Sequence, residues 1–507
     1  MEFQVLGNAA HTLQTVAVAT LFFGIVFFFP KLMYYGKISK LPALDSQKSY
    51  FISSARKIYA EGYQKYKDSV YRVKTNDDET HVVLPPLFLA EVRKLPDTVL
   101  SFPKAVENLM ETRYTQIITE SQMMSHSIKA DLTPNLSRLN SVVFEEVQQA
   151  VSEDIPACED WTSINIYFTL VHMVAKITGR LFVGPDLCRH KDYIDSAINY
   201  TMDVIAVQQG AKKINPWLRP ILAPRLPEYK RLRQREKDAE ALLEPIIEAR
   251  RVAEANDPDY QRPDDMLAWF MARSKDYRYH SNLELAKLQL GLIFAAIHTT
   301  TLTATNILYT LASQPEYMKP LREEIRTVMA KNGGTITTRA LQQMIKLDSY
   351  MKEVVRFDPI SITSFNRKVL RGFTLSNGQY IPAGVTVVIP THEIYNDPAN
   401  FSMEATDPKE FDGFRYSKIR ENGNATDHAR NQFVTANDQS TMFGYGRHAC
   451  PGRFFAANEI KMILARLILD YDIKNEGDHV GRYPNHEYGG SVSVDATKNL
   501  LLKKVEV

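Results

Sequence analysis

The residues best suited to chemistry in this chain lie in one short stretch near its C-terminus. It reads Phe443-Gly444-Tyr445-Gly446-Arg447-His448-Ala449-Cys450-Pro451-Gly452. Glycines at 444, 446 and 452 let the backbone turn sharply and approach a flat ligand closely. Apolar residues at helical spacing follow, from Ala456 to Tyr471, so Cys450 is predicted to lie near the N-terminus of a helix. The helix dipole and free N–H groups there favour a thiolate, which is the ligand that a heme iron needs for oxygen chemistry.

Two other interpretations of the stretch are open. The first is a buried structural cysteine in a glycine-rich loop, which is the usual role of an isolated cysteine. The second is a zinc site made by His448 and Cys450. It is the poorer one, because no second Cys/His pair at ligand spacing accompanies it.

The stretch resembles the heme-binding loop of the cytochrome P-450 superfamily, the heme-thiolate monooxygenases. That pattern is Phe, two residues, Gly, one residue, Arg or His, one residue, Cys, one residue, Gly. It is filled without a gap by Phe443, Gly446, His448, Cys450 and Gly452. The resemblance implies that Cys450 is the axial ligand of the iron in heme b and that the other four residues bind the cofactor with it. It also implies a mainly α fold with a small β region, in one large domain behind an N-terminal transmembrane anchor.

A long apolar helix is predicted between Ser281 and Pro315. Ser281 and Glu284 have capping-box spacing, and about 33 residues would span ~50 Å. In its middle, Ala295-Ala296-Ile297-His298-Thr299 resembles the family's oxygen-activation segment. The resemblance implies that Thr299 hydrogen-bonds the bound oxygen and helps to deliver protons. His298 stands where the family has Asp or Glu, and histidine still relays protons near neutral pH. The alternative is a stripe of threonines bonding back to helix carbonyls.

Two further sets of residues follow from the resemblance. Glu353 and Arg356, three residues apart on one helix face, resemble the structural Glu-x-x-Arg pair, and Arg415 is the expected third member. Arg367 and His448 are the expected partners of the heme propionates, because cations pair with buried carboxylates. The substrate pocket is expected to include Phe294, Ala295, Ile362 and Phe365.

The N-terminus predicts a membrane anchor. From Phe3 to Pro30 there is no Asp, Glu, Lys or Arg, and we predict an anchor over residues 1–40 with a span at about 12–30. The alternatives are a cleaved signal peptide and a buried helix, but Glu2 is the wrong charge for a signal peptide. Positive residues follow the apolar run, at Lys31, Lys37 and Lys40, which favours a cytosolic domain at residues 41–507. The segment Leu41–Leu44 is expected to be a stiff hinge, and Trp217–Pro224 either dips into the membrane or is a buried loop.

Composition limits the classes of protein to which this chain can belong. The chain has 507 residues, 44% of them hydrophobic, and a net charge of +2, which argues against nucleic-acid binding. Three cysteines imply no disulfide framework. Strands are expected at 82–84, on both sides of an Asn377-Gly378 turn between 367 and 390, and as a pair within 491–507.

The predicted function is insertion of one oxygen atom from O2 into a lipophilic small molecule. The chain is similar to fungal secondary-metabolism members that oxidise terpenoids, in phrases such as Arg113-Tyr114-Thr115, Asp131-Leu132-Thr133 and Arg322-Glu323-Glu324-Ile325. No Gly-x-Gly-x-x-Gly loop follows a strand, so a separate NADPH-cytochrome P-450 reductase is the expected electron donor. It would dock near Arg447 and Arg453, in the endoplasmic reticulum membrane. The alternatives are a reductase-independent isomerase or dehydratase of the family and a non-catalytic heme-binding protein.

Overall fold

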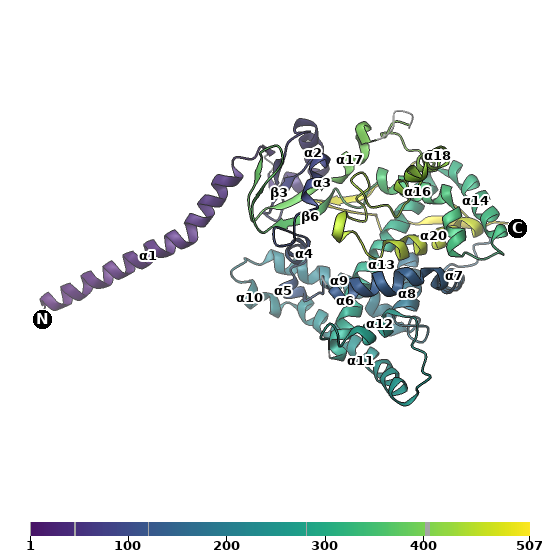
Figure 1. Cartoon of the computed structure of the whole chain (residues 1–507), viewed down its shortest axis with the longest axis horizontal. Coiled ribbons are helices and arrows are strands. Elements are labelled where there is room, and N and C mark those ends of the chain that lie inside the picture. The colour runs from purple at the N-terminus through teal and green to yellow at the C-terminus, as the bar shows by residue number, and fades with distance from the viewer. Residues whose placement is uncertain (1, 45–46, 120, 280, 401–405, 507) are drawn as a thin grey trace.

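One long helix, α13 (Asn282–Ser313), crosses the centre of the molecule, and the other helices pack around it (Figure 1). The computed structural model describes residues 2–44, 47–119, 121–279, 281–400 and 406–506. The predicted capping box is confirmed, because Ser281 Oγ accepts from the N–H of Glu284 at 3.2 Å and the Glu284 carboxylate accepts from the N–H of Ser281 at 2.9 Å. The helix ends before Pro315, as predicted.

The predicted fold class, mainly α with a small β region, is confirmed. The helices before α13 are α1 (Glu2–Ile38), α2 (Lys48–Lys65), α3 (Leu89–Val92), α4 (Phe102–Met110), α5 (Thr112–Thr115), α6 (Gln122–Ser127), α7 (Thr133–Asp154), α8 (Ile166–Phe182), α9 (Lys191–Lys213), α10 (Arg219–Leu222), α11 (Pro227–Asn256) and α12 (Met266–Arg273). Those after it are α14 (Met318–Lys331), α15 (Thr338–Gln343), α16 (Ile345–Phe357), α17 (Thr391–Asn396), α18 (Arg415–Asn422), α19 (Ala425–Arg430) and α20 (Arg453–Asp470). Apolar side chains of α7, α8, α13, α16 and α20 build the largest core.

The strands of the described residues form one main sheet and three small ones. The main sheet has the order β1-β2-β3-β9-β6-β4, and the others pair β10-β13-β5, β11-β12 and β7-β8. The strands are β1 (Ala43–Leu44), β2 (Tyr71–Lys74), β3 (Thr80–Val83), β4 (Leu100–Ser101), β5 (Thr162–Ile164), β6 (Thr363–Val369), β7 (Phe373–Thr374), β8 (Tyr380–Ile381), β9 (Thr386–Pro390), β10 (Tyr471–Asn475), β11 (His486–Tyr488), β12 (Ser491–Ser493) and β13 (Leu500–Lys504).

The strand predictions succeeded where pairing is local. The turn at Asn377-Gly378 joins β7 to β8, and Gly378 has the positive φ of 84° that the turn needs. The predicted pairing within residues 491–507 is wrong. Strands β12 and β13 both exist, but β12 pairs with β11, and β13 lies between β10 and β5. Pairing with strand β5, more than 300 residues earlier in the chain, leaves no local signal.

The N-terminal helix is the candidate anchor. Helix α1 projects away from the rest of the molecule (Figure 1). Its segment Gln14–Ile38 is long and apolar enough to cross a membrane, with a mean hydropathy of 2.1, and no part of its most apolar 18-residue window is buried by protein. Helix α13 meets the same criteria but lies mostly within the core, so its apolar surface is already covered.

The connection from α1 to the domain differs from the expected hinge. Ile38 and Leu41 are buried, with 4% and 5% of their surfaces exposed. Residues Ala43 and Leu44 form β1, which pairs in parallel with β2 at the edge of the main sheet. Because backbone hydrogen bonds and apolar packing hold this segment, it is part of the domain, and the prediction of a hinge at 41–44 is wrong.

The segment after α9 exposes a group of apolar side chains. Trp217 is 78% exposed, and Leu218, Ile221 and Leu222 are 49%, 56% and 41% exposed. The interpretation of 217–224 as a buried loop is therefore wrong. Contiguous exposed apolar side chains of this kind mark a surface for a membrane or another protein.

The largest core also contains an unusual carboxyl group. Glu459 of α20 is fully buried, and burial raises the pKa of its carboxyl to about 8. One oxygen accepts a hydrogen bond from Thr178 Oγ1 of α8 at 2.8 Å, and the other has no hydrogen-bond partner among the described residues. At neutral pH the folded protein therefore holds Glu459 protonated, whereas the unfolded chain ionises it.

This difference predicts a pH-dependent effect of Glu459→Gln on stability. A raised folded-state pKa contributes stability below the unfolded value of 4.5, and that contribution is lost as the pH rises to about 8. Glutamine keeps the Thr178 bond and cannot ionise. We expect the variant to gain stability over wild type by about 1.4 kcal/mol per pH unit across this window, measured by chemical denaturation at pH 5.5, 7 and 8. A stability difference between Glu459→Gln and wild type that does not change with pH would contradict the raised pKa of Glu459.

Candidate functional site

The loop before α20 is closed by its own backbone. The N–H of Cys450 donates to the carbonyl of Phe443 at 2.7 Å. Gly444 and Gly446 both have φ of 74°, which favours glycine. A Cβ at Gly444 would lie 3.1 Å from the carbonyl oxygen of His448, so the loop tolerates no side chain there.

Gly452 differs from these two glycines. Its φ is −83°, and no atom lies within 4 Å of where its Cβ would be. The expectation that the turn itself requires Gly452 is therefore wrong. The open space leaves the backbone accessible at the position just before α20, where a flat ligand could approach.

Cys450 lies three residues before α20, as the sequence predicted. Its side chain is exposed, yet protein atoms surround it closely enough that desolvation raises the pKa of the thiol. The backbone N–H groups of Gly452 and Arg453 and the Arg453 guanidinium lower that pKa, but desolvation outweighs them. The helix terminus alone therefore does not ionise this cysteine, and a bound metal ion would have to do so.

One turn of α13 is not covered by protein. Ala295 and Thr299 are exposed, although the residues on both sides of them along the helix are mostly buried. Helix α13 packs against α20, the helix that follows Cys450. The Thr299 hydroxyl donates to the carbonyl oxygen of Ala295 at 2.7 Å, so its lone pairs can accept a hydrogen bond.

His298 lies beside Thr299 in sequence but faces elsewhere. Its ring is 9% exposed and lies between α8 and α9. Nδ1 is 3.2 Å from the hydroxyl of Tyr167, and Nε2 is 2.9 Å from the carbonyl oxygen of Ile198. Burial lowers the pKa of the ring.

Arg367 is a buried cation without a carboxylate partner. It is 5% exposed, and none of the described carboxylates lies within ion-pair distance of it. The guanidinium lies over the rings of Phe102 at 4.8 Å and Phe365 at 4.4 Å, and its Nη1 donates to the carbonyl of Asn366. Burial lowers the pKa of Arg367 to about 10. A buried guanidinium in this state is suited to bind an anionic group.

His448 has a protein partner that the sequence did not indicate. Its Nε2 is 2.8 Å from Asp97 Oδ1, and its ring packs against Phe102 at 5.2 Å. Arg447 also pairs with Asp97, at 3.5 Å. Asp97 lies about 350 residues before the loop, and no motif around it could have pointed to this contact. The expected partner of His448 was an external carboxylate, and the structure supplies an internal one.

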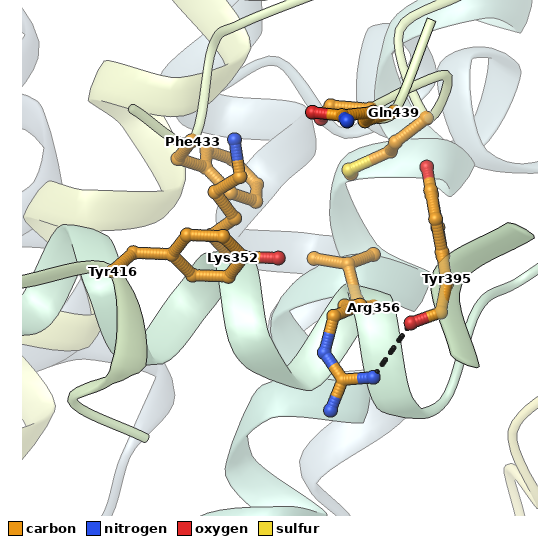
Figure 2. A pocket seen from close by; sticks show the side chains of 9 residues that line it. Lys352, Arg356, Tyr395, Tyr416, Phe433 and Gln439 are labelled. Carbon is orange, nitrogen blue, oxygen red and sulfur yellow. Dashed lines mark hydrogen bonds between the residues drawn. The ribbon is translucent and has the colours of Figure 1, made fainter. Parts of the chain in front are cut away.

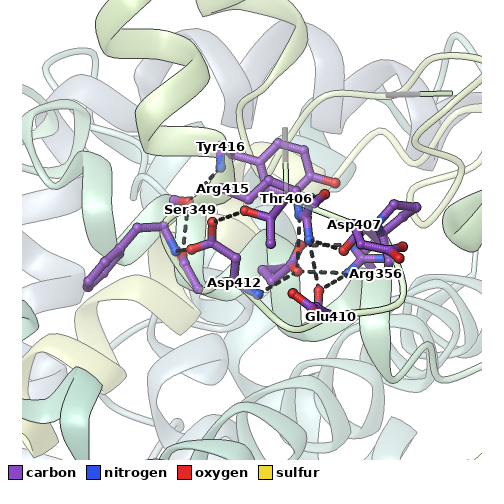
Figure 3. A network of polar contacts seen from close by, with 12 residues as sticks. Ser349, Arg356, Thr406, Asp407, Glu410, Asp412, Arg415 and Tyr416 are labelled. Carbon is purple, nitrogen blue, oxygen red and sulfur yellow. Dashed lines mark hydrogen bonds and ion pairs between the residues drawn. The ribbon is translucent and has the colours of Figure 1, made fainter. Parts of the chain in front are cut away.

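Glu353, Arg356 and Arg415 meet in a buried network, of which Figure 3 labels the two arginines. Arg356 makes two hydrogen bonds to the Glu353 carboxylate, at 2.7 and 2.8 Å, and Arg415 Nε lies 3.2 Å from the same group. All three side chains are 3% exposed or less. The guanidinium of Arg415 also donates to the carbonyls of Thr406, Asp407 and Glu410, so the network holds the segment that leads towards the cysteine loop.

A small cavity lies between α16 and the segment at 433–442 (Figure 2). Its volume is about 10 Å³, room for about one water molecule and far less than a cofactor needs. Lys352 lines it, with Nζ donating to the carbonyls of Arg430 and Gln432 at 3.3 and 3.0 Å and lying 4.8 Å from the Tyr416 ring. Burial lowers the pKa of Lys352 to about 7. The cavity is therefore a packing gap beside the network in Figure 3 and not the ligand site.

The expected pocket residues separate into two groups. Ala295 is part of the uncovered turn. Phe294, next to it, is partly buried against α9 and α11. Ile362 and Phe365 instead lie in apolar cores under the main sheet, 1% and 5% exposed. Phe365 lies at a bulge in β6 with a φ of 57° and packs its ring under Arg367, where both residues line a small cavity with His448. Sequence position alone gave no sign of this bulge.

The comparisons with known proteins agree with this geometry. The family model described as Cytochrome P-450 matches residues 52–499. The chain belongs to the cytochrome P-450 family. Cytochrome P-450 monooxygenase ATR3 of Stachybotrys chlorohalonatus is 40% identical over 84% of this chain and 89% of its own. The ent-kaurene oxidase of Gibberella intermedia is 33% identical over 90% of this chain and 84% of its own.

A solved P-450 structure shows the same fold. It is the cyanobacterial CYP120A1 with bound retinoic acid, which has a TM-score of 0.68 and 17% identity, and the match covers 92% of this chain and 99% of that one. This P-450 is therefore a heme-thiolate monooxygenase, like the relatives that the sequence comparison found.

The residues present fit a heme. Cys450 is the accessible thiol at the start of α20, the uncovered turn of α13 offers an apolar face, and the unpaired charge of Arg367 suits a propionate. A thiolate-ligated heme, when bound, supplies the oxygen-activating chemistry. The protein supplies the ligand atom, the counter-charge and the hydroxyl of Thr299.

The buried network predicts a large effect of Glu353→Gln. The substitution leaves two buried guanidinium groups without their shared carboxylate, which costs about 3–5 kcal/mol. The matched control is Glu248→Gln, because Glu248 pairs with Arg251 at the same three-residue spacing on an exposed surface, and its loss should cost less than about 1 kcal/mol. Chemical denaturation of both variants measures the difference. Equal costs would show that burial of the pair is irrelevant.

Arg367→Leu is expected to weaken heme binding. Removing one charge-assisted pair corresponds to about tenfold in affinity. Transfer of heme to apomyoglobin measures its retention, and Arg371→Leu, an exposed arginine four residues on, is the control. Unchanged retention in Arg367→Leu would exclude Arg367 as a heme contact.

Proposed function

We propose that this P-450 hydroxylates a lipophilic terpenoid or meroterpenoid of secondary metabolism. The observation that carries the proposal is the uncovered turn of α13, which presents the methyl group of Ala295 and the hydroxyl of Thr299 and no charged side chain. Such a surface suits an apolar substrate. The ent-kaurene oxidase relative, whose named substrate is a diterpene, supports the class.

Four residues of this chain would do the protein's part of the reaction. Cys450 provides the thiolate. Arg367 balances a propionate charge in a site shielded from water. Ala295 leaves room for oxygen and substrate, and Thr299 moves a proton at Oγ1, since its hydroxyl donates to the Ala295 carbonyl and has lone pairs that can accept.

The partners in this proposal are a membrane and a reductase. Residues 1–40 anchor the protein in the endoplasmic reticulum, with residues 41–507 as the cytosolic catalytic domain. The apolar group at 217–222 would contact the same membrane. Arg447, 46% exposed, and Arg453 would contact an NADPH-cytochrome P-450 reductase, which delivers the electrons.

Two alternative functions make different predictions. A reductase-independent isomerase or dehydratase of the family would convert substrate without NADPH. A non-catalytic heme-binding protein would neither bind terpenoids beside the heme nor consume NADPH. The exposed Thr299 hydroxyl favours oxygen activation over the non-catalytic alternative, which needs no proton-handling group there, and the NADPH requirement separates oxygen activation from the isomerase or dehydratase.

Spectral titration tests the substrate class. The full-length heme-loaded protein is titrated with ent-kaurene and other terpenoids, and a shift of the Soret band towards the high-spin position reports binding. Each ligand that binds is then incubated with reductase and NADPH. We expect a hydroxylated product that is absent when NADPH is omitted. Conversion without NADPH would contradict the proposal, as would the absence of any terpenoid response from protein with an intact thiolate-ligated carbonyl spectrum.

Thr299→Ala tests the proton step. We expect product formed per NADPH to fall on the order of ten- to a hundredfold, with the missing electrons recovered as hydrogen peroxide. Thr299→Ser keeps the hydroxyl and should retain most of the coupling. Equal losses in both variants would show that the methyl group, and not the hydroxyl, matters at this position.

A further inference from the structure

The side chain of His298 connects three helices at the level of the uncovered turn. From α13 its ring reaches α8, where Nδ1 lies 3.2 Å from Tyr167 Oη, and α9, where Nε2 lies 2.9 Å from the carbonyl oxygen of Ile198. No other side chain of the described part of α13 makes a hydrogen bond to α9.

These two partners determine the chemical state of the ring. A backbone carbonyl only accepts, so Nε2 must carry the proton. In a neutral ring Nδ1 is then the unprotonated nitrogen, and it accepts the hydrogen bond that Tyr167 donates. The ring is neutral, in one tautomer, and both nitrogens are occupied. No described carboxylate lies within ion-pair distance of His298 to stabilise a positive charge, and its burial disfavours that charge.

This arrangement does not connect His298 to Thr299. No hydrogen bond joins the two described side chains, and the Thr299 hydroxyl donates to Ala295 and Ala296 in its own helix. A proton leaving Nε2 would reach a peptide carbonyl, which does not pass it on. A relay from His298 to Thr299 would require the ring to break both of its bonds and rotate through a packed interface.

We infer that His298 is a positioning residue, a neutral clip that holds the Thr299 turn of α13 against α8 and α9, and that it does not relay protons. The inference rests on the proposed function of Thr299. Helix α9 leads into the exposed apolar segment at 217–222. Its C-terminal half is bound to α4 by Gln208, which donates to the Leu109 carbonyl at 2.8 Å, and to the turn between β2 and β3 by Lys212, which pairs with Asp77 at 2.5 Å. A shift of α9 on substrate entry would therefore reach the turn that carries Thr299.

Substitution by residues with side-chain amides distinguishes positioning from proton relay, because an amide forms hydrogen bonds but neither takes up nor releases a proton at neutral pH. In His298→Gln the amide nitrogen stands in for Nε2 and keeps the bond to Ile198. In His298→Asn the amide oxygen stands in for Nδ1 and keeps the bond to Tyr167. His298→Leu keeps neither bond, and Tyr167→Phe removes only the hydroxyl. The full-length heme-loaded variants are compared in coupling (product formed per NADPH) and in KM and kcat.

If His298 is a clip, the loss of coupling should increase stepwise across the variants. His298→Gln should stay within about twofold of wild type in coupling, and Tyr167→Phe and His298→Asn should lose roughly three- to fivefold with a raised KM. His298→Leu should lose tenfold or more. If Gln, Asn and Leu all lose coupling equally while Tyr167→Phe does not, the relay is correct and the inference is overturned.

A second measurement does not depend on turnover. The 15N spectrum of histidine in the diamagnetic reduced carbonyl complex, with the His298 signal assigned by its loss in His298→Gln, should show a neutral ring with the proton on Nε2 at pH 7. A proton on Nδ1, or a protonated ring, would overturn the inference. If no terpenoid is converted, the proposed substrate class fails, while this spectrum still tests the clip.

Discussion

The buried carboxylate of Glu353 constrains the path of the chain between the main sheet and the cysteine loop. It is completely buried on α16, and it accepts from Arg356, from Arg415 and from the N–H of Asp412 at 3.0 Å. The two guanidinium groups in turn bind the carbonyls of the segment around residues 406–410. Backbone without regular secondary structure is stable inside a protein only if its polar groups have partners, and the arginines provide them. The segment leads into α18 and α19, which precede the cysteine loop in the chain.

The central helix, α13, packs into the core along most of its surface and leaves one turn uncovered. Most of α13 is covered by apolar side chains, which is why a helix with membrane-like hydropathy lies in the core. One turn is left uncovered at Ala295 and Thr299, and the residue between them on the next face, His298, is bound to α8 and α9. Adjacent residues of a helix point about 100° apart. One turn can therefore present the Thr299 hydroxyl to the site while the His298 side chain hydrogen-bonds to the neighbouring helices.

Three buried ionisable side chains, Arg367, Lys352 and Glu459, differ in their partners and in the charge that they can keep. Arg367 lacks a described carboxylate partner, Lys352 is bound by carbonyls and an aromatic ring, and Glu459 has one orphaned oxygen. Burial shifts the pKa of each towards its neutral form. Glu459 and Lys352 can become neutral near physiological pH, but an arginine cannot, so only Arg367 keeps a charge that a cofactor carboxylate would neutralise.

The sequence by itself determined the elements with local causes. The cysteine loop, the capped central helix, the Asn377-Gly378 turn and the Glu353–Arg356 pair all depend on residues within a few positions of one another, where spacing fixes geometry. Only the tertiary structure decided which residues meet across hundreds of positions: Asp97 with His448, β5 with β13, and Tyr167 and Ile198 with His298. It also decided that the bulge in β6 places Phe365 beside Arg367. Long-range contacts arise from packing of the whole chain, and no short segment encodes them.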